Sequence, residues 1–208
     1  MAPYHPDGGY MQYRIIQDYY KRLTQDPLED VVGHLWHNIL SGYFSVREGF
    51  ALEVQPRPAP RVTKQSNDVT VRYVKHIKQD IKTPLTLIAK NHVSEESKTV
   101  AWTDAVNQLT EYMKLARMNS TAPNEDMYGI VTVGHYSRFY VLHTDAPALA
   151  DHPRTGGAAL EFAKHEATIV ELLLDIKTKA LSPSPAGSQT RPGSSGDARP
   201  DFSGRQGR

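Results

Sequence analysis

The fold is decided by residues 84–133, which read PLTLIAKNHVSEESKTVAWTDAVNQLTEYMKLARMNSTAPNEDMYGIVTV. The segment opens at residues 84–90 with a short apolar run after a proline, which predicts a strand. Between Trp102 and Ala116 apolar residues recur three and four positions apart, which predicts a helix with one buried face. Residues 127–133 are almost continuously apolar, as expected of a strand covered on both faces. This order predicts a crossover helix packed on a sheet.

The strands on either side of this segment complete the sheet. Residues 50–55 alternate between apolar and polar side chains, which predicts a strand with Phe50, Leu52 and Val54 on its buried face. A second strand is predicted at residues 68–74, and a further one at residues 136–143 after a turn at Gly134. We therefore expect a mixed central sheet of about five strands, flanked by helices.

The remaining helices are predicted at the two ends of the domain. Helical spacing of large apolar residues predicts a helix between residues 10 and 25, which Pro27 ends. A second helix is predicted from Pro27 to Gly42, because a proline is favoured in a first turn and the apolar residues after it lie on one face. After a loop at residues 145–157, the last helix is predicted from Ala158 to Lys179. The predicted order is α-α-β-β-β-α-β-β-α.

Composition divides the chain into one domain and two ends. The apolar residues are concentrated in residues 10–180, which predicts a single α/β domain of ordinary size. Residues 181–208 are rich in Ser, Pro, Gly and Arg, and such a stretch buries too little apolar surface to offset its ordering entropy. We expect these residues and residues 1–9 to be disordered.

The overall composition excludes several classes of protein. A formal net charge of +1 over 208 residues is unlike that of a polybasic nucleic-acid coat. The absence of cysteine excludes disulfides, iron–sulfur clusters and thiolate zinc sites. No segment approaches the roughly 18 consecutive apolar residues of a membrane span, and the first residues do not resemble a signal peptide. We expect an intracellular protein, cytoplasmic or nuclear, with no membrane partner.

Five polar residues stand at positions suited to a site. Asp68 opens the second predicted strand, Lys90 closes the third, Gln108 and Tyr112 share one face of the following helix, and Glu29 lies in an early helical turn. Each also has a structural explanation. Asp is common in turns, a Lys at a strand end is usually solvated, Gln108 and Tyr112 suit the border of a buried helix face, and a Glu stabilises a helix N-terminus.

The order of these residues resembles the restriction-endonuclease-like, PD-(D/E)XK nuclease superfamily, over residues 27–145. There a helix can supply a Glu, the second strand an Asp and the third strand a Glu/Asp-x-Lys pair, and one branch carries Gln-x-x-x-Tyr on the next helix. The resemblance implies phosphodiester hydrolysis of DNA or RNA with Mg²⁺ as cofactor. It implies that Asp68 and Glu29 bind metal, that Asp68 and Lys90 are catalytic, and that Gln108 and Tyr112 contact the substrate.

The chain departs from this pattern at one metal ligand. The residue two before Lys90 is Ile88 and the residue between them is Ala89, neither of which can bind a metal. Two hypotheses follow. In the first, a metal-dependent nuclease uses a relocated acid, for which the candidates are Glu53, Glu95, Glu96 and Glu111. In the second, the domain is a pseudoenzyme that binds nucleic acid or another protein.

A basic segment adds to the nucleic-acid hypothesis. Between residues 61 and 82, basic side chains outnumber acidic ones, and phosphates are attracted to such a segment. We expect Arg72 and Lys75 to bind substrate beside the predicted site. A solvated connection between strands explains the same charges.

Overall fold

The computed structural model describes residues 9–25, 29–54, 69–73, 75–77, 80–82, 85–92, 98–120 and 124–182. Only the backbone is described for residues 24–25, 29–30 and 98–101 and for the strands between residues 69 and 92, Val71 excepted. Most of the residues expected to be disordered therefore lie outside the described part. The helices are α1 Arg14–Gln25, α2 Glu29–Tyr43, the short 3-10 helix η1 Val46–Glu48, α3 Lys98–Met118 and α4 Glu166–Leu181.

The strands form one large mixed sheet and one small hairpin. The sheet contains β1 Phe50–Val54, β2 Val69–Tyr73, β5 Leu85–His92, β6 Met127–Val133, β7 Tyr136–Leu142, β8 Ala150–Asp151 and β9 Leu160–Glu161. Its order is β1-β2-β5-β6-β7-β8, and β9 also pairs with β7. Among the strands that the structure describes, only the β5–β6 pair is parallel. The hairpin is formed by β3 Lys75–Ile77 and β4 Asp80–Lys82. The predicted mixed sheet and its crossover helix, α3, are confirmed.

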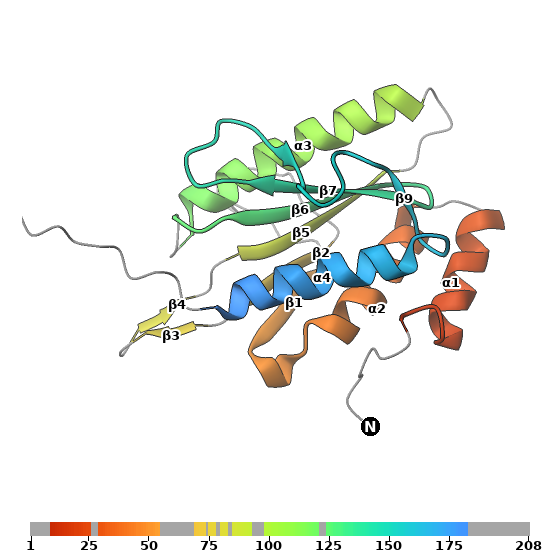
Figure 1. Cartoon of the computed structure of the whole chain (residues 1–208), viewed down its shortest axis with the longest axis horizontal. Helices are drawn as coiled ribbons and strands as arrows, with labels where there is room; N and C mark the ends of the chain where they lie inside the picture. The colour runs from red at the N-terminus through yellow and green to blue at the C-terminus, as the bar shows by residue number, and fades with distance from the viewer. Residues whose placement is uncertain are drawn as a thin grey trace, which may run out of the picture.

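Helices cover both faces of the sheet (Figure 1), with α3 on one face and α2 and α4 on the other. The alternation of side chains along β6 explains the two layers, because successive residues of a strand point to opposite faces. Tyr128 and Ile130 pack with α2 and α4, whereas Met127 and Val131 pack with α3. All of β6 is buried, as its apolar sequence predicts.

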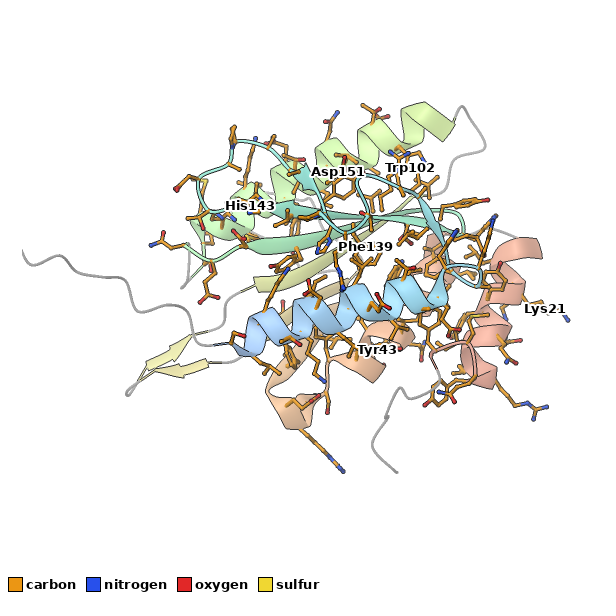
Figure 2. All side chains as sticks on the ribbon, in the orientation of Figure 1. Lys21, Tyr43, Trp102, Phe139, His143 and Asp151 are labelled. Atoms are coloured by element: carbon orange, nitrogen blue, oxygen red, sulfur yellow. The ribbon has the colours of Figure 1, made fainter. Side chains whose placement is uncertain are left out.

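The larger core lies on the face that α2 and α4 cover. Trp36 of α2 contacts Phe139 of β7, labelled in Figure 2, with an edge-on geometry and a ring separation of 6.3 Å. The indole Nε1 of Trp36 donates a 2.5 Å hydrogen bond to the buried hydroxyl of Thr132. That hydroxyl is also 3.2 Å from the Ser137 hydroxyl on β7. This polar chain lets two hydroxyl groups and an indole N–H lie in an apolar core without unpaired groups.

The second core depends on a close approach between α3 and β6. A Cβ atom built at Gly129 would lie 2.8 Å from Leu109 Cδ2 and 3.0 Å from Met113 Sδ. Glycine therefore allows α3 to lie directly on the strand. Leu109 and Met113 are both fully buried there.

The prediction of the last helix is wrong at its start, because α4 begins at Glu166 and not at Ala158. Leu160 pairs with Ser137 of β7. After Leu160, side chains hold the backbone in a turn: the Glu161 carboxylate accepts hydrogen bonds from the backbone N–H groups of Ala163 and Lys164. The Nδ1 atom of His165 accepts one from the Glu161 N–H. These local bonds replace the helical ones that the apolar spacing suggested.

Two other expectations need correction. The predicted loop at residues 145–157 contains β8, and the polar link after β2 contains the β3–β4 hairpin. Val54 is 61% exposed, so the buried face of β1 ends before this residue. It is the last residue of β1, which lies at the edge of the described sheet and pairs there with β2.

Candidate functional site

The register of β2 and β5 brings together the neighbours of two predicted catalytic residues. Val69, which follows Asp68 in the chain, pairs with Ala89, which precedes Lys90. Asp68 itself lies outside the described residues, and of Lys90 only the backbone is described. The first residue of β2 and the last residues of β5 thus lie at the same end of the sheet. The nuclease resemblance requires this arrangement.

One row of residues crosses the sheet at the position of the missing acid. Glu53 of β1 pairs with Thr70 of β2, Thr70 pairs with Ile88 of β5, and Ile88 pairs with Gly129 of β6. Neighbouring strands are about 4.8 Å apart, so the backbones of Glu53 and Ile88 are separated by about 10 Å. Directly paired residues point to the same face of a sheet. Among the suggested replacements, Glu53 therefore has its backbone in the same row as Ile88.

The other acids suggested as replacements for the missing metal ligand are Glu111, Glu95 and Glu96. Glu111 of α3 is exposed and pairs with Lys114, one helical turn away, at 3.3 Å. Glu95 and Glu96 lie outside the described residues.

The two residues of the Gln-x-x-x-Tyr motif have different environments. Leu109 lies over Gly129, which pairs with Ile88, so the turn of α3 that carries Gln108 is at the level of Ile88 in the sheet. Gln108 is exposed. Tyr112 is 2% exposed and belongs to the core under α3. The burial of Tyr112 fits a role in packing α3 against the sheet, whereas the Gln108 side chain is accessible to a ligand.

The structure does not bring Arg72 or Lys75 to the predicted site. Because β2 and β5 are antiparallel, Arg72 pairs with Leu85 at the opposite end of β5 from Lys90. Lys75 belongs to the separate hairpin, which lies at the far left of Figure 1. Neither backbone therefore flanks that of Lys90, and the expectation that the two side chains bind substrate stays a prediction, because those side chains are not described. Glu29 is the first residue of α2, and its side chain is not described.

The described residues do not fit a magnesium site. Mg²⁺ requires oxygen ligands from more than one group, but no cluster of three or more acidic or histidine side chains suited to a metal occurs among the described residues. In the row through Ile88, the described carboxylate nearest in register is that of Glu53.

An arginine and two aromatic residues lie on the α3 face of β7, and sequence reasoning missed them. The guanidinium of Arg138 lies over the ring of Trp102, 4.6 Å from its centroid. Trp102, labelled at one end of α3 in Figure 2, belongs to the first turns of that helix. Burial raises the pKa of the Tyr140 phenol, and a side-chain hydrogen bond from Arg138 opposes this rise. Arg138 Nε is buried and has no hydrogen-bond partner among the described residues.

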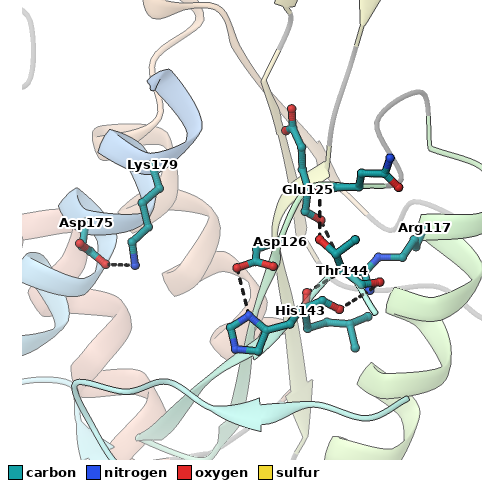
Figure 3. A network of polar contacts seen from close by, with 9 residues as sticks. Arg117, Glu125, Asp126, His143, Thr144, Asp175 and Lys179 are labelled. Atoms are coloured by element: carbon teal, nitrogen blue, oxygen red, sulfur yellow. Dashed lines mark hydrogen bonds and ion pairs between the residues drawn. The ribbon is translucent and has the colours of Figure 1, made fainter. Parts of the chain in front are cut away.

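A second polar group lies at the other end of the sheet (Figure 3). The guanidinium of Arg117, at the end of α3, donates hydrogen bonds to the carbonyl groups of Leu142 (2.6 Å), His143 (2.6 Å), Thr144 (3.1 Å) and Glu125 (3.4 Å). Burial lowers the pKa of Arg117, and nearby carboxylates oppose this effect. Arg117 thus joins α3 to the chain just before β6 and just after β7.

An open groove of about 590 Å³ lies beside Arg117 and is also lined by Lys114, Met118 and Pro147. It is at the opposite end of β6 from Val131, the partner of Lys90. The groove is therefore separate from the predicted nuclease site.

Ionisable side chains also lie between α4 and the sheet (Figure 3). The Asp126 carboxylate lies 3.0 Å from the His143 imidazole. On α4, the Asp175 carboxylate lies 2.7 Å from the Lys179 ammonium. The Lys179 ammonium also lies 5.5 Å from the centroid of the Tyr128 ring. The contact between Lys179 and Tyr128 joins α4 to the amino end of β6, whereas the Asp126–His143 pair joins the chain before β6 to the chain after β7.

His152 is buried beside this group and is 1% exposed. Its Nδ1 atom accepts a 3.4 Å hydrogen bond from the Arg154 backbone N–H, and its Nε2 atom lies 3.8 Å from Asp175. Burial lowers the pKa of His152; Lys179 and Arg154 lower it further, and Asp175 opposes them. The imidazole is thus held in its neutral form.

Comparisons with models of protein families, with curated proteins and with solved structures found no match. In the part of the chain that the structure describes, no helix combines the length and apolar character needed to span a membrane. Function is therefore inferred from the sheet register and from the polar groups described above.

Proposed function

We propose that this chain is a divergent PD-(D/E)XK-like domain, related to metal-dependent nucleases, that binds nucleic acid without hydrolysing it. The observation that carries the proposal is the pairing of Val69 with Ala89. This pairing joins the strand that follows Asp68 to the strand that contains Lys90, at one end of the sheet. The superfamily places its strand Asp and its Lys on two such strands.

The topology also supports the proposal. Three antiparallel strands, β1, β2 and β5, are followed by the crossover helix α3 and then by β6, which lies parallel to β5. The resemblance assigns the Asp to the second strand, the Lys to the third and the Gln-x-x-x-Tyr motif to the next helix. In this chain those elements are β2, β5 and α3.

The loss of hydrolysis is proposed from the donor atoms. Activating water for attack on a phosphodiester requires a metal held by converging oxygen ligands. Ile88 and Ala89 supply none, and the described residues contain no group suited to a metal. A cationic and aromatic surface that binds phosphates and bases does not require that metal.

The test combines binding and cleavage on the full chain. Labelled single-stranded DNA, duplex DNA and single-stranded RNA are titrated by fluorescence anisotropy in EDTA. The same substrates are then incubated with Mg²⁺ or Mn²⁺ and separated by gel electrophoresis. We expect binding that weakens with added salt and no metal-dependent products. If folded protein binds none of the three, the nucleic-acid proposal fails and a protein-interaction module is favoured.

A second candidate function is hydrolysis by a rearranged site, and the observation that favours it is the row that joins Glu53 to Ile88 through Thr70. Under this hypothesis cleavage occurs with metal and is lost in Glu53→Gln, Asp68→Asn and Lys90→Ala. The matched control is Glu171→Gln, because Glu171 is an exposed glutamate on α4 and was not a candidate for the metal ligand. Cleavage that survives Glu53→Gln excludes this role for Glu53.

A further inference from the structure

The position of Arg138 in the sheet relates it to the predicted site. Lys90 of β5 pairs with Val131 of β6, and Val131 pairs with Arg138 of β7. Two strand spacings put the backbones of Lys90 and Arg138 about 10 Å apart. Paired residues point to the same face, and Val131 packs with α3. Arg138 therefore lies on the face of the sheet that carries Gln108 and the row through Ile88.

The surroundings of Arg138 hold its guanidinium in place without neutralising it. Trp102 stacks against it at 4.6 Å, and it donates a hydrogen bond to the Tyr140 phenol. Both neighbours are uncharged groups when Tyr140 is protonated, the form that burial favours. Arg138 remains partly exposed. Among the described residues, none of the recorded ion pairs includes Arg138.

Such an arrangement suits a phosphate. A planar guanidinium presents N–H donors in a fork that matches phosphate oxygens, and stacking on an aromatic ring fixes the plane of that fork. A guanidinium with a buried Nε and no carboxylate partner is usually satisfied by a ligand or by water.

We propose that Arg138, oriented by Trp102 and Tyr140, binds a backbone phosphate of the nucleic acid. This inference rests on the proposed function and adds a residue that neither the resemblance nor the motif spacing indicated. Arg138 is a binding residue, and Trp102 is a positioning residue that acts through it.

The experiment measures binding of a labelled single-stranded DNA by anisotropy at several salt concentrations. The proteins are the wild type, Arg138→Gln, Arg138→Lys and the control Arg154→Gln. Arg154 is an exposed arginine whose side chain lies 4.0 Å from that of Glu171. We expect Arg138→Gln to weaken binding about tenfold and to reduce the slope of log K against log salt by about one. Arg138→Lys keeps the charge but not the fork, and we expect a smaller loss. Arg154→Gln binds like the wild type.

Tryptophan fluorescence provides a second measurement that does not depend on the Arg138 variants. The chain has two tryptophans, and Trp36 is fully buried. We expect unlabelled DNA to change the emission of the wild type and not that of Trp102→Phe. If the Arg138→Gln protein fails to fold, as judged by circular dichroism, this change in emission still tests whether DNA binds beside Trp102.

The outcomes separate this inference from the proposed function. If the wild type binds DNA and Arg138→Gln binds it equally well with an unchanged salt slope, Arg138 is not a phosphate contact and the proposed function stands. The same conclusion follows if DNA leaves the emission of Trp102 unchanged. If the folded wild type binds neither DNA nor RNA, the proposed function fails, and the inference fails with it.

Discussion

The indole N–H of Trp36 and the hydroxyl of Thr132 form a buried hydrogen bond of 2.5 Å between residues 96 positions apart in the chain. The bond joins α2 to β6, the strand at the centre of both cores. A buried N–H that loses its acceptor has no access to water, so this contact is a sensitive point in the larger core.

Thr132→Val keeps the shape of the side chain and removes the acceptor for Trp36. We expect it to lower the free energy of unfolding by about 1–3 kcal/mol, the cost of an unpaired buried donor. Urea unfolding followed by circular dichroism measures the change. The control is Thr178→Ala on the exposed face of α4, where the hydroxyl donates to the Leu174 carbonyl. A loss within about 0.5 kcal/mol is expected there, and an equal effect at both sites would contradict the explanation.

Gly129→Ala tests the close approach of α3 to β6. The added Cβ would overlap Leu109 Cδ2 at 2.8 Å, and we expect a destabilisation of about 1–3 kcal/mol from overpacking. The double variant with Leu109→Ala removes the overlapping atom. Its loss of stability should be less than the sum of the two single losses. Additive losses, measured by urea unfolding, would show that Leu109 does not limit the approach.

Arg117→Gln tests the contact that joins α3 to the ends of β6 and β7. It removes a charged donor to four carbonyl groups, and we expect a loss of about 2–3 kcal/mol. Hydrogen exchange should become faster at residues 142–145 in particular. Arg22→Gln on α1, whose exposed side chain pairs with Asp18, is the control. Unchanged exchange at residues 142–145 would contradict the proposed role of Arg117.

His152 should make stability depend on pH. Burial and the neighbouring cations lower the pKa of the folded-state imidazole below its ordinary value of about 6.5. As the pH falls below about 6.5, the unfolded state takes up a proton that the folded state does not, and the free energy of unfolding decreases. The stabilisation that comes from the neutral His152 is therefore complete above about pH 6.5. It is lost as the pH falls toward the lowered pKa of the folded state.

Urea unfolding between pH 8 and pH 5.5 measures this dependence. We expect His152→Gln to flatten the decrease, whatever its effect on absolute stability. The control is Thr178→Ala on the exposed face of α4, which changes no ionisable group, and this variant should keep the wild-type slope. Parallel pH curves for the wild type and His152→Gln would refute the assignment.

Regular elements with a strong sequence pattern were predictable. β6 has the bounds that its apolar run predicts, because every one of its residues is buried and the turn at Gly134, with a φ of 58°, ends it. The amphipathic spacing from Trp102 to Ala116 locates α3 for the same reason. The two-residue strands β8 and β9 have no such pattern, because they depend on pairing with β7.

The site was predictable only in part. The pattern of strands and helices predicted the strand that follows Asp68 and the elements that carry Lys90 and Gln108, but antiparallel pairing decides which ends meet, and this placed Arg72 away from Lys90. The contact of Arg138 with Trp102 depends on tertiary packing. One signal was available in the sequence: Arg138 is the one charged residue of β7, whose other residues are apolar or aromatic except for Ser137, and a charge in such a strand is costly unless it has a partner or a ligand.

The alternation along β6 has a consequence for how such a domain can evolve. Tyr128 and Ile130 belong to one core and Val131 to the other, so a substitution on the α3 face need not be compensated on the opposite face. Side chains around Gln108 and Arg138 can therefore be substituted during evolution. The larger core, which contains Trp36, continues to stabilise the fold. In a domain divided in this way, one face of the sheet can change while the other maintains the fold.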